Sequence, residues 1–431
     1  MSFNIPHWCA IIEHNDSGDD AMTQREIDEY IASIPYLSFQ QRRMLKEESQ
    51  DLELWGEEHI TDIMPTADEL ALMQKNQVRS AFNKAMEKIA QMRRNPTDYS
   101  TFNPKYDFNE RKPNVVADFK APDRIMGSCP CPKDGELTRC CNLKTLDAVQ
   151  QCGFACAYCS IQSFYSHNEI KVVSDLDSYL ENLKLEEDAW HIGTGQSSDS
   201  LLLGDDYGTL SALARFARRN PKTIIELKTK SARTDWLSQD LPRNIVATWS
   251  VNASTIAKKE EHLTATLEAR IEAALKSVEK GRLVGFHIHP MVHFKGWEDE
   301  YAALVKLLCD RIDPSNVMMV GIGALTFTKQ NLKALRESGR PTRVTQMELT
   351  PAAGKFSYPL ETKREMFSFV YSQFPREWKD NAFFYLCMED PSLWMPCLGR
   401  EYPSNAAFEA DMKANYLGKH ATPLGFHEVS R

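Results

Sequence analysis

The chain has 431 residues, of which 42% are hydrophobic, enough to bury one large core with appendages, so two or three structural units are expected. Its formal net charge of −9 argues against a protein that coats nucleic acid nonspecifically, because phosphate binding is dominated by Lys and Arg. The sequence has no run of about twenty apolar residues and no signal-peptide pattern at its start, which predicts a cytoplasmic protein without membrane contact.

The first 110 residues or so are predicted to form polar helices joined by turns. Thr66 and Glu69 have the spacing of a capping box, and apolar residues then recur at helical intervals until Pro96 ends the run. The predicted helix is amphipathic, so we expect it to pack on another element. Residues 96–120 are rich in Pro, Asn and Asp without periodicity, which predicts a linker or an extended wrap across a neighbouring domain.

From about residue 145 short apolar runs alternate with helical stretches. The runs predict six strands: one just before Cys152, then 190–194, 223–229, 245–251, 283–289 and 317–325. Helices are predicted around 206–219, 264–280, 298–312 and 328–338. Such alternation with short links requires parallel strands. It favours an α/β fold, a partial (β/α)6 TIM-type barrel, although a doubly wound sheet would give similar signals.

Three regions follow from these changes in composition and periodicity. Residues 1–110 are expected to form an N-terminal helical extension and linker. Residues 111–345 would form the partial barrel together with an upstream Cys-rich segment, and residues 346–431 a C-terminal α/β segment that packs on the barrel. The sequence contains no internal repeat of fixed period.

Eleven cysteines are many for such a chain, and clustered thiols in a reducing compartment suggest metal ligation before disulfides. The run CGFACAYC, with Cys152, Cys156 and Cys159, has the spacing CxxxCxxC just after the first predicted strand. Three thiolates can hold three irons of a [4Fe–4S] cluster while the fourth binds S-adenosylmethionine (SAM), whose reductive cleavage yields a 5'-deoxyadenosyl radical. The spacing, with Tyr158 before the last cysteine, predicts a radical SAM enzyme in preference to ordinary thiols or an incomplete zinc site.

At these residues the chain resembles the spore photoproduct lyase family, radical SAM enzymes that reverse a thymine dimer in DNA. The likeness spans roughly residues 145–375 and includes CGFACAYCSIQ, TKSARTDWL, WSVNAS, RIEAALKSVEKGRLVGFHIHPMVHFKGWEDEY and GKFSYP. The long segment is the most specific, because its helix, its strand, Pro290 and Gly296-Trp297-Glu298 recur in the same order. The resemblance implies a partial barrel with SAM across the strand ends.

The resemblance also implies which residues contact the cofactors. By position, Lys230, Ser250 and Asn252 look like SAM-contacting residues, with Tyr158 beside the adenine and Asp199 as a further cofactor contact. Strand ends are where such folds bind ligands, although each residue has an alternative as a polar residue of the barrel rim. The expected cofactors are a [4Fe–4S] cluster and SAM, and the expected reductant is a flavodoxin- or ferredoxin-type protein.

Two departures from the family pattern bear on the reaction. In the lyase, a cysteine on the loop after the second strand donates a hydrogen atom to the product radical, whereas Gln196 stands at that place here. The tyrosine that follows the lyase's last cluster cysteine is Ser160 here. The expected catalytic residues are Gln196, Ser198 and Tyr158. Because an amide does not readily give up a hydrogen atom, simple repair would require another thiol, such as Cys397, as the donor.

Four more cysteines lie just upstream: Cys129, Cys131, Cys140 and Cys141, in GSCPCPKDGELTRCCN. Four thiols in so short a segment could hold zinc or an additional Fe–S cluster. Because Cys140 and Cys141 are adjacent, the two can bind one ion together only with strain. Thiols without metal, or one cysteine that serves as a hydrogen donor, are therefore the alternative.

Three other patterns are interpreted as parts of the folded structure in preference to binding sites. His287 and His289 alternate along the fifth predicted strand, and we expect histidines held by hydrogen bonds in preference to a metal pair. Residues 383–386 (FFYL) and Trp394 are expected to pack in the core in preference to stacking on a base. The run Lys258-Lys259-Glu260-Glu261 is expected to be solvated surface.

The sequence thus predicts a radical SAM enzyme that acts on a thymine-type base in DNA or on a thymidine derivative. Two reactions compete: reversal of a thymine photoproduct, and rearrangement of an already modified thymidine in DNA hypermodification, such as moving a bond within a glycyl substituent. Rearrangement needs no protein hydrogen donor, because the abstracted atom can return to the product, so the missing cysteine favours it. The alternatives are a radical SAM enzyme with a non-nucleic-acid substrate and a non-catalytic Fe–S or zinc protein that binds a partner.

Overall fold

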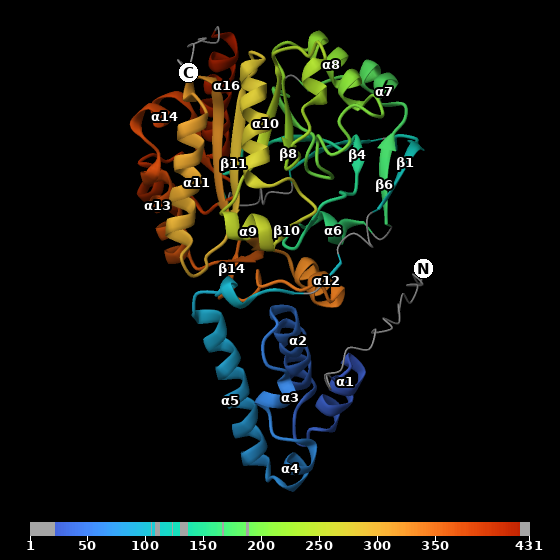
Figure 1. The fold of residues 1–431 in the computed structure, drawn as a ribbon, viewed down its shortest axis with the longest axis vertical. Coiled ribbons are helices and arrows are strands. Elements are labelled where there is room, and N and C mark those ends of the chain that lie inside the picture. Colours follow the sequence, from blue (N-terminus) through green and yellow to red (C-terminus); the bar gives the residue numbers. More distant parts are fainter. Residues whose placement is uncertain are drawn as a thin grey trace. The chain divides into compact units, whose positions relative to one another are not determined.

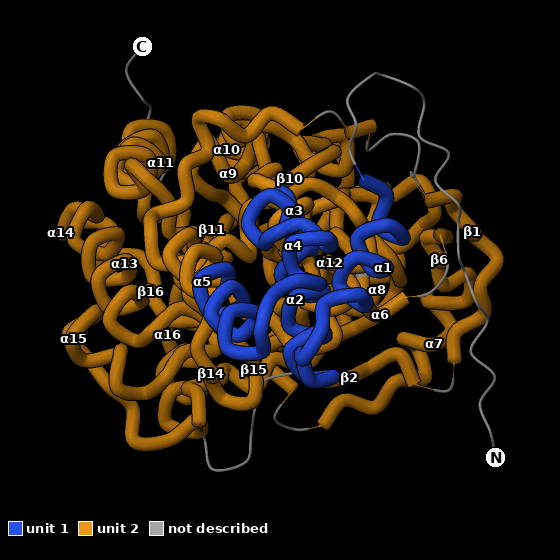
Figure 2. The backbone as a smooth tube through the Cα atoms, turned by 90° about the horizontal axis from the view of Figure 1, so that it is seen from below, with its two compact units in different colours: residues 1–49, 59–85 blue, residues 50–58, 86–431 orange. Residues whose placement is uncertain are grey.

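The computed structural model describes residues 22–104, 106–107, 113–122, 124–129, 137–165, 168–186 and 189–422. The chain forms two compact units, which Figure 2 colours separately. Unit 1 comprises residues 1–49 and 59–85, and unit 2 comprises residues 50–58 and 86–431. Helices α2 (Phe39–Trp55) and α5 (Lys75–Arg94) each contribute residues to both units.

Unit 1 is built from short helices. It contains α1 (Gln24–Ser33), α3 (Ile60–Ile63), α4 (Ala67–Leu72) and the first parts of α2 and α5. Each of these helices contributes buried apolar side chains, among them Ile27, Ile31, Leu45, Ile60, Leu70, Val78 and Phe82. The Tyr30 phenol donates a 2.6 Å hydrogen bond to the Pro65 carbonyl. Helices this short depend on such packing for their stability.

The capping box predicted at Thr66 and Glu69 is present at the start of α4. The Thr66 side chain accepts from the Glu69 amide, and the Glu69 carboxylate accepts from the Thr66 amide at 2.9 Å. The single helix predicted to continue to Pro96 is wrong, because the backbone becomes extended at Met73 and α5 begins separately at Lys75.

Residues 50–58 belong to unit 2 through buried polar contacts. The carboxylate of Asp51, whose side chain is 1% exposed, accepts from Arg93 at 2.7 Å and from Arg336 at 2.8 Å. The Trp55 indole donates to Thr345 Oγ1 at 2.9 Å. A buried carboxylate needs such cationic partners, so these contacts fix the end of α2 to the unit.

The central sheet of unit 2 has eight strands in the order β16-β12-β11-β9-β8-β7-β3-β2. They are β2 (Met126–Ser128), β3 (Lys144–Leu146), β7 (His191–Gly193), β8 (Ile224–Thr229), β9 (Ile245–Ser250), β11 (Val284–Met291), β12 (Val317–Ala324) and β16 (Phe383–Leu386). Every pair from β3 to β16 is parallel, whereas β2 is antiparallel to β3. A doubly wound sheet would reverse its strand order at a switch point, so this order selects the barrel alternative.

The predicted α/β fold class is confirmed as a curled half-barrel (Figure 1). Strands β7, β8, β9, β11 and β12 lie where strands were predicted. The first parallel strand of the barrel is β3, which ends five residues earlier than the position just before Cys152; the strand at that position, β4 (Val149–Gln150), pairs outside the central sheet. Strand β2 was not predicted, and the residues of β16 were predicted to pack in the core without being recognised as a strand; all four are buried.

Helices connect the strands. Those at predicted positions are α8 (Thr209–Arg219), α10 (Leu267–Glu279), α11 (Trp297–Arg311) and α12 (Lys329–Ser338). The others of unit 2 are α6 (Ile161–Phe164), α7 (Leu176–Asn182), α9 (Ser254–Lys259), α13 (Leu360–Gln373), α14 (Arg376–Asn381), α15 (Trp394–Leu398) and α16 (Asn405–Ala421). Figure 1 shows α10 and α11 running along the central strands. No helix in the described ranges is both long and apolar enough to span a bilayer.

Helix α16 lies between the two ends of the curled sheet. Tyr416 contacts Phe383 on β16, with ring centroids 6.0 Å apart, and His191 on β7, with centroids 5.4 Å apart. Glu409 accepts from the indole of Trp190, the residue before β7, at 3.0 Å. One helix thus contacts both sides of the half-barrel and closes its interior there.

The interior face of the sheet has apolar residues near the amino ends of its strands (Ile224, Val246, Met319 and Phe383) and mostly polar residues elsewhere. Residues paired in register on neighbouring strands face the same side, and this face carries His191, Gly193, Glu226, Lys228, Thr248, Ser250, His287, His289, Gly321 and Tyr385. A Cβ at Gly321 would lie 2.8 Å from the Tyr385 ring. A Cβ at Gly323 would lie 3.0 Å from the His289 ring. Glycine at these two positions therefore makes room for interior side chains.

Small sheets surround the barrel. Strand β1 (Asn114–Phe119) pairs with β6 (Glu169–Val173), which also pairs with β4 (Val149–Gln150). Of the two alternatives predicted for residues 96–120, a linker or an extended wrap, β1 takes the extended form. The β-branched pair Val115-Val116 suits the extended backbone that β6 completes. A second small sheet joins β13 (Thr326–Phe327), β15 (Lys355–Ser357) and β14 (Thr350–Ala352).

Candidate active site

The three cysteines of the CxxxCxxC run lie on a loop that a short two-stranded sheet holds in place. Cys152 follows β4, Cys156 ends β5 (Ala155–Cys156), and Cys159 precedes α6. Strand β5 pairs with β10 (Glu261–His262), and Cys156 lies opposite Glu261. The loop is therefore attached to the segment that follows β9, at the carboxyl end of the parallel strands.

Two of the three sulfur atoms have backbone donors close by. The Phe154 amide donates to Cys152 Sγ at 3.4 Å, and the Ile161 amide donates to Cys159. Burial raises the pKa of all three thiols, and electrostatic interaction among the thiols raises the pKa values of Cys152 and Cys156 further. A bound metal would reverse these shifts, and N–H donors to sulfur are among the features that tune an Fe–S cluster.

The donor set fits a [4Fe–4S] cluster with one open iron. In the described part of the chain, no three Cys, His, Asp or Glu side chains stand at the spacing that a single ion requires. A cluster has a different requirement, because each cysteine binds a different iron and the sulfurs stand further apart. Cys152, Cys156 and Cys159 supply three thiols from one loop, which leaves the fourth iron for another ligand.

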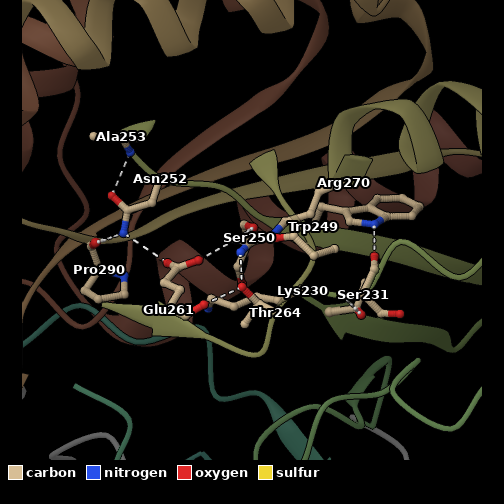
Figure 3. Close-up of polar contacts among 12 residues, drawn as sticks. Lys230, Ser231, Trp249, Ser250, Asn252, Ala253, Glu261, Thr264, Arg270 and Pro290 are labelled. Atoms are coloured by element: carbon tan, nitrogen blue, oxygen red, sulfur yellow. Dashed lines mark hydrogen bonds and ion pairs between the residues drawn. The ribbon is translucent and has the colours of Figure 1, made fainter. Parts of the chain in front are cut away.

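Glu261, opposite Cys156, is the centre of a buried ionic network (Figure 3). Its Oε2 lies 2.5 Å from Arg270 Nη1, and the two side chains are 1% and 0% exposed, respectively. Arg270 also donates to the carbonyls of Ser250 at 3.0 Å and Ala265 at 2.9 Å. A buried carboxylate is tolerated only when it is paired and hydrogen-bonded, and Arg270 supplies that pairing.

The second oxygen of Glu261 accepts hydrogen bonds from two of the residues that are predicted to contact SAM. Oε1 accepts from the Tyr158 phenol and, at 3.3 Å, from Asn252 Nδ2. Lys230 Nζ lies 5.7 Å from the centroid of the Tyr158 ring. Burial by itself would lower the pKa of Lys230, but the Glu261 carboxylate outweighs it and the pKa is raised. Together with Ser250, whose carbonyl Arg270 holds, these residues form one group beside the cysteine loop.

The prediction that Lys258 to Glu261 is solvated surface is wrong for both glutamates. Glu260 is 0% exposed and accepts from the Tyr99 phenol at 2.7 Å and from the Thr342 hydroxyl at 2.6 Å. Burial raises the pKa of Glu260 to about 7. The run looks like a charged helix face, but it crosses from α9 into β10, where the side chains turn inward.

Glu261 and Arg270 are thus site residues that sequence reasoning missed. The sequence did indicate that Arg270 is buried, because it lies on the apolar face of the predicted helix, three residues after Leu267 and four before Ala274. A charged residue within such a stripe requires a buried partner. Glu261 carried no comparable signal, since only the pairing of β10 with β5 shows that it faces the cysteine loop.

Asp199 and Ser198 lie beside Cys152. The Asp199 carboxylate accepts from Thr229 Oγ1 at 2.7 Å and from the Lys230 amide at 2.6 Å. Ser198 donates to the carbonyl of Gln151, the residue before Cys152, at 2.8 Å. After burial, Asp199 is the largest cause that raises the pKa of Cys152. The two side chains therefore join the cysteine loop to the end of β8.

The Gln196 side chain folds back over Gly193 on β7. A Cβ at Gly193 would lie 3.0 Å from Gln196 Oε1, a space that only glycine leaves open. This oxygen is buried and has no hydrogen-bond partner within the described residues. An unpaired buried polar atom costs about 1–3 kcal/mol, so a ligand that donates to it would recover that free energy.

The barrel interior holds His287 in a hydrogen-bonded cluster, as predicted, through its Nε2; its Nδ1 is buried without a hydrogen-bond partner among the described residues. Glu226 lies 2.7 Å from His287 Nε2 and 2.9 Å from His191 Nε2, and it accepts from Thr248 Oγ1 at 2.7 Å. Burial would raise the pKa of Glu226, but hydrogen bonds from the two histidines hold it well below its ordinary value. Burial lowers the pKa of His287 to about 4.

The upstream cysteines gather with a cysteine from another part of the chain. Cys140 and Cys141 lie near Cys387, which follows β16, because the Arg139 amide donates to the Glu389 carbonyl at 3.0 Å; Cys129 joins them through the 2.9 Å bond from its amide to the Leu143 carbonyl. Cys131 lies outside the described residues. Cys397, named above as a substitute donor, lies on α15, where its sulfur is 3.7 Å from the Arg364 carbonyl of α13.

The comparisons with known proteins identify the family. A family model described as spore photoproduct lyase matches residues 146–364. The spore photoproduct lyase of Clostridium acetobutylicum is 25% identical over 174 residues, which are 39% of this chain and 52% of the relative; the match thus spans about half of the relative's length.

Solved structures of spore photoproduct lyase share the fold. The structure complexed with dinucleoside spore photoproduct has a TM-score of 0.53 at 18% identity. A variant with bound AdoMet and dinucleoside spore photoproduct has a TM-score of 0.52 at 20% identity. Each match covers 71% of this chain and 94% of the other.

Proposed function

The chain belongs to the spore photoproduct lyase family, and from that premise we propose that it is a radical SAM enzyme that rearranges a modified thymidine in DNA. The single observation that carries the radical SAM assignment is the loop that presents Cys152, Cys156 and Cys159 beside the group around Glu261. In that arrangement three cysteine thiols lie next to the Lys230 ammonium, the Tyr158 phenol and the Asn252 amide. All of them stand at the carboxyl end of a half-barrel, where such folds bind their substrates and cofactors.

In this proposal the three cysteines hold a [4Fe–4S] cluster, and Tyr158, Lys230, Ser250, Asn252 and Asp199 bind SAM. When bound and reduced, the cluster with SAM supplies a 5'-deoxyadenosyl radical. Lys230 would pair with the carboxylate of SAM, since Glu261 keeps it protonated. Tyr158 offers an aromatic face to the adenine, and its phenol is fixed by Glu261. Asn252 is held from two further sides, by the Pro290 carbonyl at 2.9 Å and the Tyr301 phenol at 2.7 Å.

A thymine-type base in DNA is the proposed substrate. Its support is the family membership and the related structure that is complexed with dinucleoside spore photoproduct. The barrel interior suits part of an anionic ligand, because Lys228 lies two residues after Glu226 on β8 and faces the same side, near Lys230. A base in duplex DNA would have to leave the stack to reach this interior.

Rearrangement is preferred to repair because of Gln196. The lyase places a hydrogen-donating cysteine where this chain has an amide, and the amide lies over Gly193. In a rearrangement the hydrogen atom removed from the substrate returns to the product, so no protein donor is required. The amide can instead hold a polar substituent of the substrate. Reversal of a thymine photoproduct remains the second candidate, and the same family membership supports it.

The test is the mass of nucleosides from DNA treated with the reconstituted enzyme, SAM and reductant. The substrates are duplexes that contain thymidine with a glycyl substituent on its methyl carbon, and duplexes that contain spore photoproduct. An isomer of unchanged mass and altered retention from the first duplex supports rearrangement. Conversion of the photoproduct to two thymidines, with the first duplex unchanged, would replace the proposal by repair. Cleavage of SAM without change in either DNA would move the substrate to another class.

A further inference from the structure

Two segments upstream of β3 and a third from the C-terminal part of the chain meet at the seam between the two edges of the half-barrel. The Arg139 amide donates to the Glu389 carbonyl at 3.0 Å, so the segment before β3 pairs with the segment after β16. The Cys129 amide donates to the Leu143 carbonyl at 2.9 Å, which continues the pairing of β2 with β3. These bonds bring Cys129, Cys140, Cys141 and Cys387 to one place.

Two of these cysteines face the barrel interior. Cys387 follows Tyr385 by two residues, its amide continues the β16 ladder with a 2.7 Å bond to Ile322, and Tyr385 lies over Gly321 on the interior face. Cys129 lies opposite Leu143, whose side chain reaches the interior position of Gly193. The two thiols therefore point from opposite edges of the sheet into the same space.

The other two cysteines complete the group. The amide of Cys140 donates to Asn405 Oδ1 at 3.0 Å, which fixes the pair at the start of α16. Cys140 and Cys141 are joined by a side-chain hydrogen bond, and Cys141 interacts electrostatically with Cys129 and Cys387. The group thus has a fixed backbone on three elements before any ligand is considered.

We propose that Cys129, Cys140, Cys141 and Cys387 hold a second thiolate-bound metal centre at the seam of the barrel. Four sulfurs from three fixed segments form a soft donor set that selects zinc or an iron–sulfur cluster. No three metal-binding side chains within the described ranges stand at single-ion spacing. A multi-iron cluster tolerates a wider spacing of thiols than a single ion does, and a zinc ion would have to draw the thiols together. Cys387 is the ligand that sequence spacing did not indicate.

The experiment removes the first cluster and asks whether metal remains. The variant Cys152→Ala/Cys156→Ala/Cys159→Ala, isolated without oxygen, is reconstituted with iron and sulfide or, separately, titrated with zinc. We expect it to retain iron with acid-labile sulfide, or zinc, in stoichiometric amount. Further replacement of Cys387 by Ser should remove most of this metal. Cys309→Ser, a half-buried cysteine of α11, is the matched control and should keep it.

Two measurements keep the test decisive if the Cys387→Ser variant is unstable. Cobalt(II) added to the triple variant should give the charge-transfer absorption of thiolate-bound cobalt. Cys387→His, which retains a metal ligand, should bind more metal than Cys387→Ser. Absence of iron, zinc and thiolate–cobalt absorption in the triple variant would overturn the proposal, as would metal content that is indifferent to Cys387. Formation of 5'-deoxyadenosine by the wild-type enzyme is measured separately, so failure here leaves the proposed function standing.

Discussion

The guanidinium of Arg270 lies 2.5 Å from the carboxylate of Glu261, and neither side chain is more than 1% exposed. Replacing Arg270 by Met would leave the carboxylate buried without its cation. We expect the free energy of unfolding to fall by about 3–5 kcal/mol, measured by urea denaturation. The pair Arg311 and Glu272 provides the control, because its atoms are also 2.5 Å apart but the side chains are 43% and 44% exposed. Arg311→Met should cost less than about 1 kcal/mol, and equal losses would contradict the argument.

A second pair of variants separates cofactor binding from stability. Tyr158 and Tyr99 each donate a hydrogen bond to a buried glutamate, Glu261 and Glu260 respectively. Only Tyr158 belongs to the proposed SAM site, where its bond to Glu261 fixes the ring that faces the adenine. Tyr158→Phe should therefore weaken SAM binding about tenfold in equilibrium dialysis, since a hydrogen bond to a charged group contributes about 1.5 kcal/mol or more. Tyr99→Phe should leave SAM affinity unchanged. Equal effects of the two substitutions on SAM affinity would remove Tyr158 from the site.

The cluster assignment is tested by single substitutions. Replacing Cys152, Cys156 or Cys159 by Ala should remove the part of the visible absorbance that belongs to this cluster and abolish the formation of 5'-deoxyadenosine, because two thiolates hold a [4Fe–4S] cluster poorly. Metal held elsewhere would contribute residual iron, so the decisive readout is SAM cleavage. Cys309→Ala should behave as wild type. Any of the three variants that still cleaves SAM would refute the assignment.

The interior histidine predicts a pH dependence of stability. Burial, followed by the nearby Lys228, lowers the pKa of His287 from 6.5 to about 4. Below pH 6.5 the unfolded chain binds a proton at this histidine, whereas the folded chain binds it only near pH 4. The free energy of unfolding is therefore highest above pH 6.5 and falls as the pH drops from 6.5 to about 4. For one such histidine the loss is up to roughly 3 kcal/mol. His287→Gln in the cluster-free triple variant should flatten this slope in urea denaturation between pH 7 and 5; an unchanged slope would show that other groups produce it.

Following one hydrogen atom distinguishes rearrangement from repair. With substrate deuterated at the abstracted carbon, rearrangement should return deuterium to the product, and SAM should act catalytically. The wild-type enzyme, with Gln196, should turn over without a thiol at this position. The variant Gln196→Cys should divert the reaction, because a hydrogen-donating thiol there would quench the substrate radical early. Solvent hydrogen at the quenched carbon, with one SAM consumed per turnover, would show a hidden donor in the protein.

Local patterns in the sequence predicted much of the barrel. Strands β7, β8, β9, β11 and β12 were recognised because apolar runs bounded by turns reveal strands without reference to partners. The three cysteines were recognised for the same reason, since the cluster motif lies within one loop of eight residues, from Cys152 to Cys159. The capping box at Thr66 is equally local, as both of its hydrogen bonds stay within one turn.

Tertiary structure alone decided where the charged residues lie. Glu260 and Glu261 were predicted to be solvated surface because a charged run has no local mark of burial. The partners of Glu260, Tyr99 and Thr342, come from distant positions, and Glu261 meets Arg270 across the turn between β10 and α10. The position of Cys387 beside Cys129 depends likewise on the closure of the sheet, a long-range event. A motif within one loop is set by short-range geometry, whereas a buried carboxylate or a thiol group at a seam is defined by segments that only the folded chain brings together.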